Sequence, residues 1–159
     1  MTQARDAVYL AGPAVLRPDA DAIGLALKAM CEAEGLEALW QGDNKIDPHD
    51  LTAPARQLFN ANVAMIKRAR AVVADISPFR GPHMDCGTAA EIGRAGAWRK
   101  PIFAYTEDCD GLLIENFGLP ENLMIACEIE PDVAPSAAIA IKRCARHLRY
   151  LRSRSLEQV

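Results

Sequence analysis

Short apolar runs alternate along this chain with longer segments in which apolar residues recur every three or four positions. The short runs are 7–11, 36–40, 71–76, 101–105 and 123–129. The longer segments with helical periodicity are 19–35, 54–70, 88–98 and 136–150. Apolar runs that alternate with amphipathic helices predict a parallel sheet covered by helices on both faces. The pattern therefore predicts an α/β domain with five parallel strands.

The chain has 159 residues and contains no internal repeat, low-complexity segment or linker. This length suits a single domain with one core. We assign residues 1–150 to that domain and residues 151–159 to a basic C-terminal tail beyond the last helix.

Composition narrows the classes of partner. The formal net charge of −3 disfavours nucleic acid as the main partner, and no apolar run is long enough to cross a membrane. The five cysteines are scattered, which is typical of reduced thiols in a cytoplasmic protein, and the N-terminus lacks a signal-peptide pattern. The three histidines show no metal-ligand spacing. We expect neither a metal ion nor another cofactor.

The most informative stretch is 77–93, between the third apolar run and the helix that follows it. It places two carboxylates, Asp85 and Glu91, around the start of a helix at the carboxyl end of a strand. In open α/β sheets, ligands bind in the crevice at that edge. The same residues also allow a structural interpretation, because Thr88 and Glu91 have the spacing of a capping box and Asp85 would complement the helix dipole.

Glycines favour a functional interpretation of this helix. Gly87 would let a ligand approach the backbone at the turn. Gly93 and Gly96 lie inside the helix, where each costs about 1 kcal/mol relative to Ala. Together with Ala97 they form a small-residue surface that a partner could approach closely.

The available chemistry is narrow. The chain has no phosphate loop of the G-x-x-x-x-G-K type and no G-x-G-x-x-G after its first strand, where Gly12 and Pro13 stand instead. Carboxylates without histidine or metal suit glycosidic chemistry, because one of them can attack or stabilise an electron-poor anomeric carbon.

These residues resemble the nucleoside 2-deoxyribosyltransferase family. The resemblance rests on four segments: 8–13, 42–44, 74–93 and 120–124. It implies a flavodoxin-like, doubly wound fold and dimers or trimers of dimers, in which a neighbouring subunit completes each active site. It also implies a deoxyribonucleoside and a free nucleobase as substrates.

The resemblance implies roles for individual residues. Glu91 matches the nucleophile that attacks C1′, Tyr9 matches the tyrosine that orients it, and Asp85 matches the aspartate at the 5′-hydroxyl of the sugar. Asn122 matches the asparagine that the neighbouring subunit donates. The residues that the resemblance places around the substrate are Gly12, Asp43, Asn62, Phe79, Gly87, Asn122 and Met124.

Two departures from the family pattern concern the base. Many members carry an aspartate, before the third strand, that handles a proton of the leaving base, and Asn62 stands at that position here. An amide cannot carry that proton at neutral pH. Ala14, Val15 and Leu16 replace the aromatic residues of the family after the first strand. The sequence of 77–88 most resembles family members that act on purines. Asn62 in place of the aspartate also favours a purine as the base.

Two other functions stay open. A nucleoside 5′-monophosphate N-glycosidase would share the fold, although Asp85 would oppose a phosphate unless Arg80 offsets its charge. A non-catalytic module that binds nucleotide or RNA would use the basic residues of the C-terminal helix, which we interpret instead as a solvated helix face.

Overall fold

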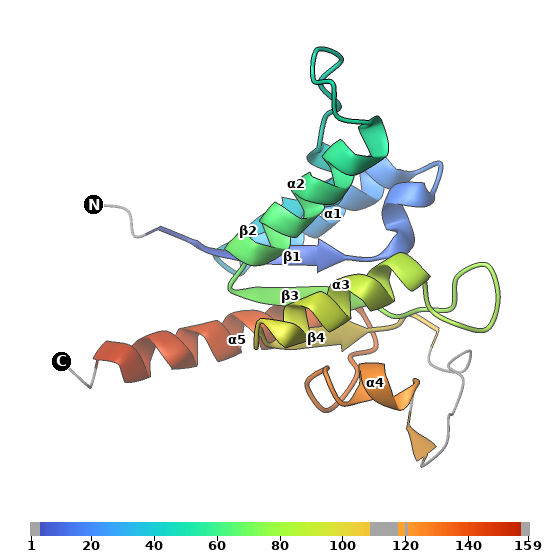
Figure 1. The fold of residues 1–159 in the computed structure, drawn as a ribbon. Helices are drawn as coiled ribbons and strands as arrows, with labels where there is room; N and C mark the ends of the chain where they lie inside the picture. Colours follow the sequence, from blue (N-terminus) through green and yellow to red (C-terminus); the bar gives the residue numbers. More distant parts are fainter. Residues whose placement is uncertain (1–3, 109–117, 120, 157–159) are drawn as a thin grey trace.

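Four parallel strands form a single sheet in the order β2-β1-β3-β4 (Figure 1). The computed structural model describes residues 4–108, 118–119 and 121–156. The strands are β1 (Asp6–Ala11), β2 (Leu36–Trp40), β3 (Ala71–Asp75) and β4 (Ile102–Tyr105). Four of the five predicted strands are thus confirmed. Each is almost wholly apolar because helices cover both faces of the sheet.

Four helices lie where the periodicity predicts them: α1 (Ala20–Ala33), α2 (Pro54–Arg68), α3 (Cys86–Ala97) and α5 (Ala137–Leu156). A further short helix, α4 (Leu123–Ala126), was not predicted. Two short 3₁₀ turns, η1 (Pro13–Leu16) and η2 (Gln41–Asp43), follow β1 and β2. Gly35 ends α1 in the left-handed region, with a φ of 75°, as expected for a residue just past a helix. No helix in the described ranges is long and apolar enough to cross a membrane.

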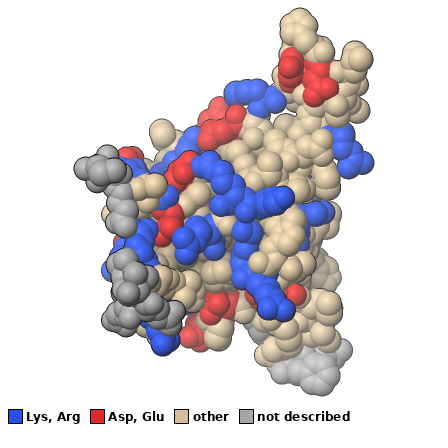
Figure 2. Space-filling model, turned by 60° about the vertical axis from the view of Figure 1, so that its left-hand side comes forward, with Lys and Arg blue, Asp and Glu red and all other residues tan. Residues whose placement is uncertain are grey.

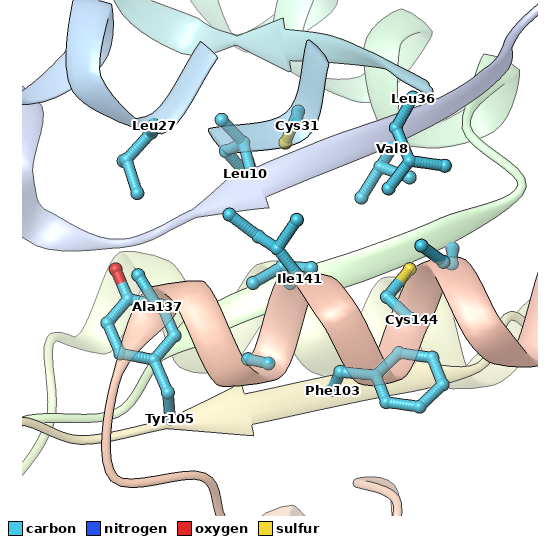
Figure 3. Close-up of a cluster of buried hydrophobic side chains, with 14 of the residues drawn as sticks. Val8, Leu10, Leu27, Cys31, Leu36, Phe103, Tyr105, Ala137, Ile141 and Cys144 are labelled. Atoms are coloured by element: carbon cyan, nitrogen blue, oxygen red, sulfur yellow. The ribbon is translucent and has the colours of Figure 1, made fainter. Parts of the chain in front are cut away.

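The two faces of the sheet have separate cores. Val8 and Leu10 of β1 point to the face covered by α1 and α5 (Figure 3), where they pack with Ile141 and Leu148. Tyr9 points to the opposite face, which α2 and α3 cover. This alternation follows from the two-residue period of a strand.

The predicted fifth strand over 123–129 is wrong. Asn122 instead caps the short helix α4, with its Oδ1 accepting from the Met124 amide at 3.0 Å. The chain then runs beside β4 without forming a strand, held by hydrogen bonds from the Glu130 and Ala134 amides to carbonyls of β4. Pro131 lacks an amide hydrogen, and Asp132 has a φ of 71°, so a regular strand is interrupted at this edge.

The helix predicted over 136–150 is longer than expected, because α5 continues to Leu156. Arg152 forms an ion pair with Asp6 at the start of β1, and this contact fastens the last turns of the helix to the sheet. The last three residues of the predicted tail, 157–159, lie outside the described residues.

Candidate active site

A tyrosine and a glutamate form the centre of the candidate site. Tyr9 is completely buried in β1 on the face that α2 and α3 cover. Its hydroxyl donates a hydrogen bond of 2.6 Å to Oε1 of Glu91, on the second turn of α3. Among the described residues, Oε2 of Glu91 is the only buried side-chain nitrogen or oxygen without a hydrogen-bond partner. One carboxylate oxygen is therefore held in place while the other is free.

Burial sets the ionisation of this pair. The pKa of Glu91 is raised from 4.5 to about 7, chiefly by removal from water; the Tyr9 hydrogen bond opposes this shift and the nearby charge of Asp85 adds to it. Burial, reinforced by the Glu91 charge and hydrogen bond, also raises the pKa of Tyr9 far above its usual range. Tyr9 consequently stays protonated as a donor, and Glu91 is partly ionised at neutral pH.

The start of α3 is capped by Asp85 and not by the Thr88–Glu91 box of the alternative, structural interpretation. Oδ2 of Asp85 accepts from the Thr88 amide at 2.9 Å and from its hydroxyl at 3.1 Å. Because Asp85 takes the Thr88 amide, Glu91 is free to point toward Tyr9. Gly87 keeps the surroundings of this carboxylate open, since a Cβ at that position would lie 2.9 Å from Oδ2 of Asp85.

Three side-chain amides form a hydrogen-bonded chain at the carboxyl edge of the sheet. Gln41 donates to the Gly12 carbonyl at 3.0 Å, Asn62 donates to Oε1 of Gln41 at 3.3 Å, and Asn44 donates to Oδ1 of Asn62 at 2.7 Å. Gly12 itself packs tightly at the end of β1, where a Cβ would lie 2.9 Å from that of Asp75. The structure thus brings Gly12 and Asn62 together through Gln41, a residue that the sequence patterns did not single out. Its only sequence signal is its place directly after β2.

Two predicted substrate residues have other partners within the chain. Asp43 forms an ion pair with Lys28 of α1, with Oδ1 2.7 Å from Nζ. Phe79 lies under the Arg80 guanidinium, 4.9 Å from the ring centre. It lines a cavity of about 510 Å³ that also borders Asp75 and Tyr105, side chains on the face of the sheet opposite Tyr9.

Asn122, predicted to reach a neighbouring subunit's site, and the predicted substrate residue Met124 lie on the surface. Asn122 and Met124 are exposed, and Met124 has 68 % of its surface accessible. Gly96 of α3 is already occupied within the chain, because a Cβ there would lie 1.9 Å from Oε2 of Glu128, whereas Gly93 has open space around it. The small-residue surface predicted for a partner is therefore reduced to Gly93 and Ala97, both of which are exposed.

The donor set of the site does not suggest a metal. No group of three or more His, Cys, Asp or Glu side chains that could hold an ion occurs in the part of the chain that the structure describes. The polar groups available at the site are the Glu91 carboxylate, the Tyr9 hydroxyl and the Asp85 carboxylate.

Comparison with known proteins finds relatives of the whole domain. The model of the nucleoside 2-deoxyribosyltransferase family matches residues 8–124. A solved structure of a 2-deoxyribosyltransferase from Leishmania mexicana is 34 % identical, with a TM-score of 0.75 over 89 % of this chain and 98 % of that one. A 2-deoxyribosyltransferase from Bacillus psychrosaccharolyticus shares the fold at 19 % identity, with a TM-score of 0.58 over 79 % of this chain and 86 % of that one.

A curated relative, an uncharacterised protein of Schizosaccharomyces pombe, is 30 % identical over 105 residues. The match covers 64 % of this chain but spans only half the length of that protein.

The fold and the site define an α/β protein with a buried glutamate–tyrosine pair at the carboxyl edge of a parallel sheet. The chain belongs to the nucleoside 2-deoxyribosyltransferase family, whose model matches well over half of its length. The family comprises transferases that act on deoxynucleosides.

Proposed function

We propose that this protein transfers 2-deoxyribose between nucleobases through a covalent intermediate on Glu91. The main support for the proposal is that the two oxygens of the Glu91 carboxylate differ: Oε1 accepts a hydrogen bond from Tyr9, and Oε2 is buried without a partner. A nucleophile needs such an oxygen, oriented and stripped of water, within reach of an electrophilic carbon.

In the first step, a lone pair of Glu91 Oε2 forms a bond to C1′ of the deoxyribonucleoside. The electrons of the C1′–N bond go to the leaving base, which takes up a proton. In the second step, a ring nitrogen of the incoming base attacks C1′, the glycosyl-ester bond breaks, and its electrons restore the carboxylate. The incoming base then releases its proton. Tyr9 keeps its hydrogen bond to Oε1 throughout and so holds the carboxylate in one orientation.

Several finer points belong to the same proposal. We infer that Asp85 binds the 5′-hydroxyl, because only its Oδ2 is used for capping and Gly87 leaves room beside it. Deoxyribonucleosides are preferred to ribonucleosides, since a 2′-hydroxyl would compete for the space and hydrogen bond near Tyr9. Purines are the better bases. A neighbouring subunit of a dimer or trimer of dimers supplies Asn122, which is consistent with the exposure of α4.

The two alternative functions have less support. Arg80, which could offset the charge of Asp85 beside a phosphate, stacks on Phe79 instead. Two of the basic residues expected to contact nucleic acid are paired with acidic ones, Arg149 with Glu34 and Arg152 with Asp6. Figure 2 shows such basic and acidic side chains intermixed on one face.

The test is to incubate the protein with deoxyinosine and adenine and to separate the products by chromatography. We expect deoxyadenosine and hypoxanthine in equal amounts, with little free deoxyribose. Free deoxyribose without deoxyadenosine would show a hydrolase. Cleavage of deoxyinosine 5′-monophosphate but not of deoxyinosine would show the nucleotide N-glycosidase.

A further inference from the structure

The amide chain of Gln41, Asn62 and Asn44 has a fixed polarity. A backbone carbonyl can only accept a hydrogen bond, so the Gly12 oxygen requires the Nε2 end of Gln41 to face it. Oε1 of Gln41 then faces Asn62 and accepts from its Nδ2, which turns Oδ1 of Asn62 toward Nδ2 of Asn44. One carbonyl thereby determines the orientation of all three amides.

This orientation decides what the chain can offer to a ligand. Asn44 uses its two N–H groups, one toward Asn62 and one toward Sδ of Met65 at 3.7 Å, and keeps its Oδ1 as an acceptor. Asn62 and Gln41 each use one N–H within the chain and keep the second as a donor. The free groups are therefore one acceptor on Asn44 and donors on its neighbours.

The chain lies on the same face as the nucleophile. Asn62 precedes Ile66 by one turn of α2, and Ile66 packs in one cluster with Tyr9 and Ile92, the residue after Glu91. Because α2 starts at the carboxyl edge of the sheet, Asn62 is nearer that edge than Ile66. Gln41 ties the same edge to Gly12, three residues beyond Tyr9.

We propose that Gln41 is a positioning residue that fixes Asn62 as a donor and Asn44 as an acceptor, so that the site selects 6-aminopurines over 6-oxopurines. This inference rests on the proposed deoxyribosyl transfer. A 6-aminopurine presents an amino hydrogen beside a ring nitrogen that accepts, which complements an acceptor beside a donor. A 6-oxopurine presents an oxygen in place of the amino group and would face Oδ1 of Asn44 with a second acceptor.

The anchor on Gly12 is what makes the selection possible. The N1–H and O6 edge of a 6-oxopurine would fit the same two asparagines if both amides were flipped. Flipping Gln41 would put its oxygen against the Gly12 oxygen, so the native chain resists that state. Without the side chain of Gln41, both orientations become available and discrimination is lost.

The experiment measures kcat/KM for adenine and for hypoxanthine as acceptors, with 2′-deoxyguanosine as the common donor. We expect the wild-type protein to favour adenine by about tenfold, the size of effect that one or two mispaired hydrogen bonds produce. Gln41→Met keeps the length of the side chain but removes its amide, and the ratio should fall to within about twofold of unity.

The matched control is Gln57→Met. Gln57 is also a half-buried glutamine with side-chain hydrogen bonds, but these go to Asp47 and Thr52, away from the amide chain. It should keep the wild-type ratio. A second variant, Asn44→Ala, removes the acceptor itself and should lower kcat/KM for adenine several-fold more than for hypoxanthine.

The outcomes separate the two proposals. Absence of transfer from 2′-deoxyguanosine to either base would overturn the proposed function, and this inference with it. Transfer with a wild-type ratio at or below unity would overturn only the selection of 6-aminopurines. A ratio that stays near tenfold in both Gln41→Met and Asn44→Ala would overturn the role of the amide chain.

Discussion

The two faces of the sheet each bury a tyrosine, and the two tyrosines differ in what they do. Tyr9 donates its hydroxyl to Glu91 on the face of α2 and α3. Tyr105 lies on the face of α1 and α5 in the core cluster of that face (Figure 3), and it lines the cavity that Phe79 and Asp75 also border. Burial raises the pKa of both tyrosines, so neither supplies a phenolate at physiological pH.

The buried polar groups on the two faces of the sheet differ in the same way as the two tyrosines. On the α1 and α5 face, Cys31 and Cys144 are buried, and burial raises the pKa of both thiols. They behave there as small apolar residues. On the other face, a carboxylate is buried with one oxygen unpaired, an arrangement that works against stability. We interpret the second face as the one shaped by function.

The largest effect is expected when the Glu91 carboxylate, which distinguishes the face of α2 and α3, is removed. Glu91→Ala should lower turnover by at least about a thousandfold, because a covalent route loses its attacking atom. The measurement is deoxyribosyl transfer from deoxyinosine to adenine. A variant that keeps a tenth of the wild-type rate would exclude Glu91 as the nucleophile.

The burial of Glu91 should also make the free energy of unfolding depend on pH. The pKa of Glu91 is about 7 in the folded protein and 4.5 in the reference state, so the folded state binds the extra proton. Stability from this group is fully present below about pH 4.5 and is lost as the pH rises through 7. Glu91→Gln should therefore gain about 2.5 kcal/mol on wild type between pH 5 and pH 8, measured by urea unfolding. An equal difference at both pH values would contradict burial as the cause of the shift.

Paired tyrosine variants test the difference between the faces directly. Tyr9→Phe should lower kcat/KM at pH 7 by about tenfold or more, because Glu91 loses its orienting donor. The Tyr9 hydrogen bond also lowers the pKa of Glu91, so the acid limb of the pH profile should move to higher pH. Tyr105→Phe removes a hydroxyl on the other face and should leave both quantities unchanged. Equal effects of the two variants would refute the functional distinction.

The sequence predicted the scaffold of both faces better than the contacts on either. The run 71–76 is short and contains two valines and an isoleucine, residues that favour strands, so β3 was predictable from the sequence. The run 123–129 misled because apolar content does not distinguish a strand from a short helix, and the capping role of Asn122 decided between them. The end of α5 depended on Arg152 meeting Asp6, 146 residues away in sequence.

The candidate site shows the same division. Local motifs single out Tyr9, Asp85 and Glu91 as candidates, but no local motif shows that Tyr9 is the partner of Glu91. The decisive contact joins Tyr9 and Glu91 across 82 residues. Gln41 was missed because its partners lie 29 and 21 residues away and no periodicity marks it.

A neighbouring subunit would extend the functional face beyond one chain, and Asn122 tests this. Asn122→Ala should lower transfer by about tenfold if the amide reaches the sugar of an adjacent site. The same change also removes the cap of α4, where Oδ1 accepts from Met124. Asn122→Ser is the matched control, because serine caps helices but lacks the amide.

Loss of transfer in both variants would support a direct role for the amide, whereas rescue by serine would reduce Asn122 to a cap. Sedimentation at assay concentration should show a dimer or larger assembly. A fully active monomer would contradict the contribution of a neighbour.

The smallest effect is expected at Asn62, a half-buried amide that is hydrogen-bonded to Gln41 and Asn44. Asn62→Asp introduces a titrating group beside the amides of Gln41 and Asn44, so the pH profile of transfer should gain an additional limb. A carboxylate accepts from Asn44 as the amide oxygen did but cannot donate to Oε1 of Gln41, and one hydrogen bond of the chain is lost. The expected change in rate at pH 7 is about threefold, with base preference shifted from purines toward pyrimidines, because the new acid can protonate the leaving base.

Rates from deoxyinosine and from thymidine, measured between pH 5 and pH 9, give both the pH profile and the base preference. An unchanged pH profile would place Asn62 away from the base, and faster transfer from thymidine than from deoxyinosine in the wild type would refute the preference for purines.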